Sequence, residues 1–189
     1  MPRKSIIALR EQVGVSFPDN TTGAITPVEV RDMFKDIIDT FSPGYAIVSI
    51  DALTLVALGI TPQVITYDTT LAETDQYLVV PASGTVQRLA QELPSTVNRV
   101  SFYADLAAPT GDEVVFSLFR DGIDIPGGST VSGQGLGNVV QASFSLITSA
   151  EDALDHTYDV RATKVTGGAD NVELANVRFI FESVPTIGI

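Results

Sequence analysis

The sequence predicts a mainly β fold, an antiparallel two-sheet sandwich or jelly roll, preceded by an extended N-terminal arm and one amphipathic α-helix. Three observations support this prediction. Apolar and polar residues alternate with a period of two in several segments between residues 45 and 189. Clusters of Gly, Pro, Asp and Thr separate those segments. The clearest helical period lies before them, in residues 26–41. Evenly spaced short strands without intervening helices are typical of all-β sandwiches.

The first 23 residues have the pattern of an extended arm that ends in a loop. Apolar side chains stand at alternate positions at Val13, Val15 and Phe17, and residues 18–23 (PDNTTG) are turn formers. The tip of the arm is basic, because the first ten residues contain three basic residues and no acidic one. We expect the arm to contact a partner through five of its residues: Arg3, Lys4, Val13, Val15 and Phe17.

A helix is predicted from Thr26 to Phe41. Thr26 suits the N-cap position, Pro27 suits the first helical position, and Glu29 completes a capping box. Residues 42–44 (SPG) then end the helix. An apolar stripe with helical spacing runs along one face: Val30, Met33, Phe34, Ile37, Ile38 and Phe41. The stripe either packs on its own chain or binds a second copy or another protein, and we include it in the predicted partner interface.

The remaining sequence divides into short strands, so we assign residues 1–44 to an attachment and oligomerisation segment and residues 45–189 to the β-sandwich. The clearest alternation places Val100, Phe102, Ala104 and Leu106 on one face. Segment 85–93 suits a short helix or, as we favour, a strand before a turn at Pro94, and segment 52–60 remains open. The predicted strands are 46–50, 63–67, 77–80, 97–106, 113–120, 138–148, 157–165 and 172–182.

Turn residues mark the connections between these strands. Asp121-Gly122 directly follows segment 113–120 and predicts a tight β-hairpin. Further breaks are expected at 109–112, at Gly127-Gly128 and at 166–168. No clean internal repeat is visible, so the strands belong to one sandwich.

Composition excludes several classes of function. With 23 acidic and 11 basic residues the net charge is −12, whereas a protein that binds nucleic acid needs clustered Lys and Arg. The absence of Cys excludes disulfides and thiolate chemistry. The N-terminal apolar run is too short for a signal peptide, and the most apolar window, residues 52–60, is too short to cross a bilayer. We therefore expect neither nucleic acid nor a membrane as a partner.

The sequence offers no catalytic constellation. His156 is the only histidine and follows an acidic segment, so we expect a solvated loop residue. Segment 133–138 (GQGLGN) lacks the third glycine at the spacing that a dinucleotide fingerprint requires, and it precedes a strand. The pairs Asp121 with Asp124 and Asp152 with Asp155 predict only local capping. We expect no enzyme, no cofactor and no metal site within one chain, and leave an inter-subunit cation open.

Parts of the sandwich resemble jelly-roll domains of the tumour-necrosis-factor and complement-C1q type. The similarity lies in segments 114–122, 158–162 and 177–182: a strand that enters a hairpin glycine, a long Gly-rich loop, and a closing strand near the C-terminus. The resemblance implies a jelly roll that assembles as a trimer.

Residues 17–27 (FPDNTTGAITP), followed by the amphipathic helix, resemble the N-terminal segment of tailed-bacteriophage virion proteins, including fibres and head-decoration proteins. This resemblance implies a structural protein on the outer surface of a virion. The expected function is a homotrimeric capsid decoration or cement protein that binds the major capsid protein and stabilises the head.

An alternative function is a tail or head fibre that binds a host receptor or glycan through strand loops such as 127–138. Exposed tyrosines would serve such a surface, and four tyrosines are candidates: Tyr45, Tyr67, Tyr77 and Tyr103. A polysaccharide-degrading enzyme is a third, less favoured function at this length.

Overall fold

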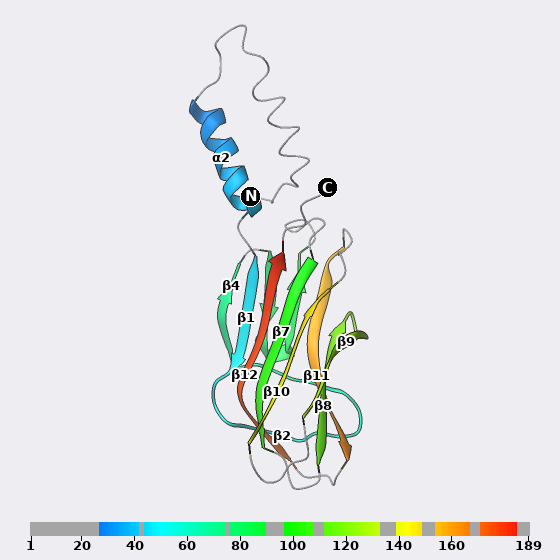
Figure 1. Ribbon diagram of the computed structural model, residues 1–189. Coiled ribbons are helices and arrows are strands. Elements are labelled where there is room, and N and C mark those ends of the chain that lie inside the picture. Colours follow the sequence, from blue (N-terminus) through cyan, green and yellow to red (C-terminus); the bar gives the residue numbers. More distant parts are fainter. Residues whose placement is uncertain are drawn as a thin grey trace.

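The fold was determined as a computed structural model, which describes residues 27–41, 44–74, 76–89, 97–107, 112–132, 139–148, 154–166 and 171–184. The predicted arm, residues 1–23, lies outside the described residues. The sandwich is elongated, and the single α-helix of the described chain, α2 (Pro27–Phe41), stands beyond one of its ends (Figure 1). The helix begins at Pro27 and ends at Phe41, as the capping and breaking residues predict.

The first sheet, sheet A, is formed by six antiparallel strands in which the chain's first and last described strands are neighbours. Five strands have the order β10-β7-β12-β1-β4, and β2 pairs with β12. Their bounds are β1 (Tyr45–Ile50), β2 (Thr54–Val56), β4 (Thr69–Glu73), β7 (Val97–Ala107), β10 (Val140–Ile147) and β12 (Val172–Val184).

The second sheet, sheet B, also has six antiparallel strands and packs face to face with sheet A. Its order is β5-β6-β11-β8-β9, and β3 pairs with β11. Its strand bounds are β3 (Gln63–Val64), β5 (Tyr77–Val80), β6 (Thr85–Arg88), β8 (Glu113–Arg120), β9 (Ile123–Ser132) and β11 (His156–Thr166), with the short 3-10 helix η1 (Pro81–Ser83) between β5 and β6.

The hydrophobic core lies between the two sheets and is built from the alternate residues of each strand. Every second residue of β7 from Val100 to Leu106 is buried, which confirms the predicted inward face. Aromatic rings join the sheets: the Phe102 ring lies 5.2 Å from that of Phe116, and the Tyr158 ring lies 4.7 Å from that of Phe181. Such aromatic pairs add to the free energy from burial.

Two strands of the structure were absent from the sequence prediction. The predicted break at Gly127-Gly128 is wrong, because β9 continues from Ile123 to Ser132. β9 is an edge strand, where a proline such as Pro126 and a positive-φ residue such as Gly127 (φ 84°) are tolerated. β4 is also an edge strand, and its mostly exposed residues lack the apolar alternation that the prediction required.

Other boundaries differ in detail. The open segment 52–60 contains β2, and segment 85–93 begins with the strand β6, as favoured. The predicted strand 63–67 shortens to the two residues of β3. The hairpin at Asp121-Gly122 is confirmed: both residues have positive φ, 51° and 79°, as a two-residue hairpin of the favoured type requires.

Candidate interaction surfaces

The helix α2 presents apolar side chains to solvent. Val28 and Phe34 expose 51% and 56% of their surface, whereas Val30, Met33 and Ile37 of the predicted stripe are half-buried. The side chains of Ile38 and Phe41 lie outside the described residues. Large apolar groups on one helix are normally covered by a neighbour, so the exposed Phe34 marks a surface available to a partner.

Cationic side chains accompany Phe34 on the helix. Arg31 and Lys35 are exposed, and Arg31 Nε lies 3.8 Å from Oδ1 of the half-buried Asp32. Exposed ion pairs of this kind contribute little to stability. Exposed basic side chains therefore stand beside the exposed Phe34, on a helix whose residues 27–41 include four acidic and two basic residues.

The predicted interface residues of the arm are not placed by the structure. They lie outside the described residues, and their role stays a prediction: Arg3, Lys4, Val13, Val15 and Phe17.

The outer face of sheet A has a centre of apolar and hydroxyl side chains. The strand registers align Ile47 with Ile180, Ile180 with Ser101, and Ser101 with Ser145. The two serine hydroxyls form a hydrogen bond of 3.0 Å, and the neighbouring Tyr103 exposes 46% of its surface. This row crosses four strands without a charged side chain.

Ion pairs lie on either side of this row. Arg99 contacts Glu182 at 3.6 Å, and Arg178 contacts Asp51 at 2.7 Å. An apolar centre bordered by polar groups is the usual anatomy of a protein interface. Sheet A therefore offers a second candidate surface for association.

The outer face of sheet B is organised around a charged pair. Arg161 Nε donates a hydrogen bond of 2.6 Å to Asp159 Oδ1, and its guanidinium lies 4.1 Å from the centre of the Phe119 ring. The hydrogen bond to Asp159 raises the pKa of Arg161 above its ordinary value. Because these groups satisfy one another, this face is better arranged for solvent than for a dry interface.

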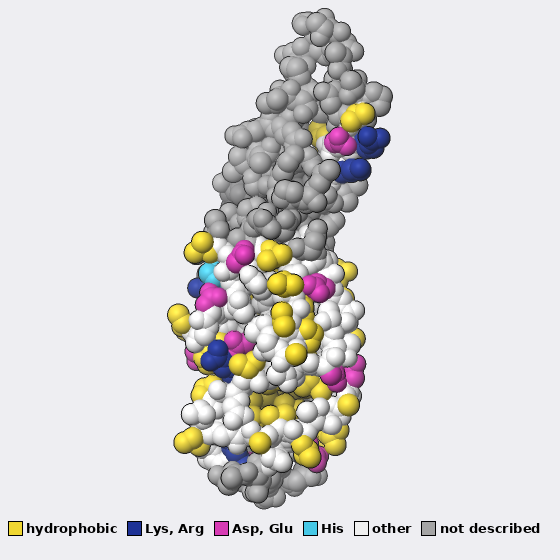
Figure 2. All heavy atoms as spheres, turned by 180° about the vertical axis from the view of Figure 1, so that it is seen from behind, with side chains coloured by type: hydrophobic (Ala, Val, Ile, Leu, Met, Phe, Trp, Pro, Cys, Tyr) yellow, Lys and Arg dark blue, Asp and Glu magenta, His cyan; other side chains and the backbone are white. Residues whose placement is uncertain are grey.

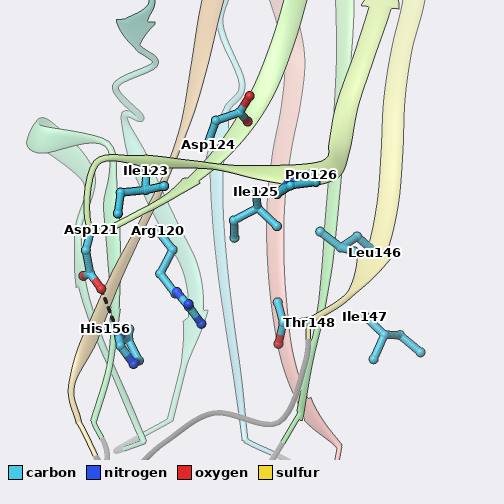
Figure 3. Close-up of a pocket in the computed structure, with 10 residues that line it drawn as sticks. All are labelled: Arg120, Asp121, Ile123, Asp124, Ile125, Pro126, Leu146, Ile147, Thr148 and His156. Carbon is cyan, nitrogen blue, oxygen red and sulfur yellow. Dashed lines mark hydrogen bonds and ion pairs between the residues drawn. The ribbon is translucent and has the colours of Figure 1, made fainter.

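A pocket of about 500 Å³ opens between the edge strands of the two sheets, β9 of sheet B and β10 of sheet A. Its apolar lining comes from both strands (Figure 3): Ile123, Ile125, Pro126, Leu146 and Ile147. Further along, β9 and β10 come together, and a Cβ atom added to Gly128 would lie 3.0 Å from Leu146 Cδ2. The missing side chain at Gly128 allows the sheets to close beneath the pocket.

Polar residues line the other side of the pocket. Oδ2 of the turn residue Asp121 lies 2.6 Å from His156 Nδ1 and forms a hydrogen bond or ion pair with it (Figure 3). Asp121 Oδ1 accepts a hydrogen bond of 2.9 Å from the Thr157 N–H. Arg120, Asp124 and Thr148 complete the lining. Partial burial raises the pKa of Asp121, but the Thr157 N–H and His156 outweigh it, so the pKa lies below its ordinary value.

His156 is not the solvated loop residue that we expected. It is the first residue of β11 and exposes only 8% of its surface. Its position shares the inward register of Tyr158 and Val160, so the alternation in β11 carried the signal that the prediction missed.

Two basic residues, Lys164 and Arg88, are also buried, and neither was predicted to be. Lys164 Nζ lies 2.5 Å from Asp112 Oδ2, with both side chains almost fully buried. Arg88 is fully buried and donates from Nη1 to the Leu154 carbonyl at 3.1 Å. Lys164 and Arg88 occupy inward positions of β11 and β6, so extending the alternation would have found them.

Of the four tyrosines considered as surface groups, only Tyr45 and Tyr103 are exposed. Tyr67 and Tyr77 expose 5% and 2% of their surface. Burial, followed by the charge of Asp159, raises the pKa of Tyr67 well above its ordinary value. Both buried rings belong to the core, where Tyr67 stacks on Phe179 at 5.9 Å.

Within the described ranges, no group of three or more His, Asp or Glu residues is arranged to hold a metal ion. The described part of the chain also contains no helix long and apolar enough to span a membrane.

Comparison with known proteins gives a structural likeness without a sequence family. No family model and no curated protein matches the sequence. The globular domain of zebrafish complement 1qA is similar in structure, with a TM-score of 0.52 and 11% identity over 75% of this chain and 96% of that one. Murine APRIL at pH 5.0 gives a TM-score of 0.52 and 6% identity over 76% and 100%.

These likenesses confirm the predicted fold class: the chain folds as an antiparallel jelly roll of the tumour-necrosis-factor and C1q type.

Proposed function

We propose that this protein is a homotrimeric capsid decoration or cement protein of a tailed bacteriophage, carried on the outer surface of the virion. Its jelly roll would form the trimer, and residues 1–43 would attach it to the major capsid protein. The resemblance of residues 17–27 to virion proteins supports the phage origin, which is itself part of the proposal.

The exposed apolar face of α2 carries the proposal. Among the described side chains, the hydrophobic core contains residues from Ala46 to Phe181 and none from α2. The helix extends beyond the sandwich instead of covering it (Figure 1). A helix that the core does not need, yet which exposes Phe34 and Val28, is suited to attachment or assembly.

The outer face of sheet A supports self-association. Its central row has apolar and hydroxyl side chains, and Tyr103 supplies an exposed aromatic group. The view from the other side shows sheet B, where hydrophobic side chains are scattered among polar ones (Figure 2). We therefore assign the trimer contact to sheet A. A closed ring of identical subunits buries such a face without leaving a free edge.

Deleting residues 1–43 tests the attachment role. Gly44 is retained because its N–H donates to Ser183 Oγ at 2.6 Å and its carbonyl accepts the Ser183 N–H at 2.7 Å. We expect a folded trimer by circular dichroism and light scattering that no longer sediments with decoration-free capsids. The full-length chain is the control. Capsid binding by the truncated chain would contradict the proposal.

The same preparations distinguish the fibre alternative. Saturable binding of the full-length trimer to host cells or to a glycan array, together with no affinity for capsids, would favour a receptor-binding fibre. A mass near that of one 20.1 kDa chain at micromolar concentration would contradict the trimer.

A further inference from the structure

We infer that the Phe34 face of α2 from one protomer docks into the β9–β10 pocket of a neighbouring protomer, so that each pocket is completed by a second copy of the chain. This inference rests on the proposed self-association and adds the residues that would join the copies.

The pocket has unsatisfied apolar surface of the right kind. Ile123 and Ile147 at its mouth expose 73% and 58% of their surface, while Ile125 and Leu146 line it from opposite strands (Figure 3). Its volume of about 500 Å³ is within the range of pockets that enclose sizeable ligands. An aromatic side chain and its helical turn match this size, and insertion would cover all four aliphatic groups.

Charge favours the same occupant. Arg31, three residues from Phe34, and Lys35, next to it, flank Phe34 on the helix, whereas Asp32, two residues away, belongs to the opposite face. Arg120, Asp121 and Asp124 line the pocket and sum to −1, with His156 beside them. Asp124 is exposed and would face Lys35. Complementary charges at the rim of an apolar contact orient the partners.

The positions of helix and pocket favour a neighbouring copy over the same chain. Both lie at one end of the sandwich, but α2 stands above β1 and β4, whereas the pocket lies at the β9–β10 edge (Figure 1). The reverse view shows the same separation, with the helix cations on one side and the histidine on the other (Figure 2). Two different surfaces on opposite sides of a protomer form a head-to-tail contact, which can close into a ring.

The reach of the helix is also limited. Gly44 is held just before β1, and Phe34 precedes it by the two connecting residues 42–43 and about two helical turns. At about 3.5 Å per extended residue and 1.5 Å per helical residue, Phe34 stays within about 20 Å of Gly44. Tyr45, Glu182, Arg99 and Ile147 form one row across β1, β12, β7 and β10, so the chain's own pocket also lies within this reach. Among neighbouring copies, only a directly adjacent one can accept the helix.

Engineered cysteines test the contact, because the native chain contains none. One tagged chain carries Phe34→Cys and a differently tagged chain carries Ile147→Cys, and both are co-expressed and oxidised gently. We expect a disulfide-linked species containing both tags on a non-reducing gel. The matched control replaces Ile147→Cys with Leu55→Cys, which is 63% exposed in β2 at the opposite end of the sandwich (Figure 1).

The control pair, Phe34→Cys with Leu55→Cys, should not give the disulfide-linked species that contains both tags. Failure of the Phe34–Ile147 pair to link the two tags above the control level would overturn the inference. A link that forms only when both cysteines are on one chain would also overturn it, because the helix would then dock in its own pocket. Light scattering of the unlinked protein separates these results from the trimer itself: a trimer without the link contradicts the docking alone, and a monomer contradicts the proposed assembly.

A charge exchange provides a second measurement. Asp124→Lys should raise the concentration at which the assembly half-dissociates by up to about fivefold, the range of exposed ion pairs, and adding Lys35→Glu should reverse the shift. An unchanged midpoint in both variants would contradict this pairing.

Discussion

Phenylalanine side chains have opposite environments in the sandwich and in the helix α2. Phe179 of β12 is fully buried, stacks with Tyr67 and meets the Phe181 ring edge-on at 5.2 Å. Phe34 of α2 exposes 56% of its surface. Phe179 is held by residues of its own chain, whereas more than half of the Phe34 surface remains exposed. An aromatic residue thus stabilises the fold in one region and is available for assembly in the other.

The largest effect on stability is expected at the buried Phe179. Phe179→Ala removes a ring from the centre of the core and leaves a cavity, so the free energy of unfolding should fall by about 3–5 kcal/mol. Chemical denaturation at one fixed protein concentration measures the loss. A change below 1 kcal/mol would mean that the core is not packed around this ring.

The buried ion pair should be nearly as sensitive. Lys164→Met leaves the carboxylate of Asp112 buried without its cation, which should cost about 3–5 kcal/mol of unfolding free energy. Adding Asp112→Leu should recover most of the loss, because an apolar pair needs no desolvated charge. A double variant as unstable as the single one would show that the pair has a role beyond charge compensation.

Asp121 should give a smaller, pH-dependent effect. Its pKa is lower in the folded protein, so its carboxylate stabilises the fold above the ordinary Asp pKa of about 4, and this stabilisation is lost as the pH falls through the folded value. The melting temperature of Asp121→Asn should therefore be lower than that of the native protein at pH 7 and approach it below pH 3. A gap that persists unchanged in acid would contradict this linkage.

The smallest effect on folding is expected at Phe34. Phe34→Ala should change the free energy of unfolding of the sandwich by no more than about 0.5 kcal/mol, because the side chain is outside the core. The same variant should weaken assembly, as seen by light scattering on dilution. A stability loss comparable to that of Phe179→Ala would show that α2 belongs to the folding unit.

Local patterns predicted much of this fold. Proline and threonine at its start and residues 42–44 at its end placed the helix, and alternation placed the inward faces of β7, β10 and β12. The edge strands β4 and β9 were missed because a strand paired on one side tolerates Pro, Gly and exposed residues. The burial of Arg88, Lys164 and His156 was not predicted. Their charged or polar side chains suggested exposure, although the strand alternation places them at inward positions.

The sequence by itself determined the helix, most of the strands and the inward face of β7, because these depend on neighbours within a few residues. Only the tertiary structure decided how distant groups meet. Asp121 pairs with His156 across 35 positions, and Lys164 with Asp112 between β11 and the start of β8. It also decided which apolar faces remain uncovered, since a helix stripe or a strand edge is buried only if another element lies over it. In the described residues, apolar groups remain exposed on the Phe34 face, in the β9–β10 pocket and on the outer face of sheet A.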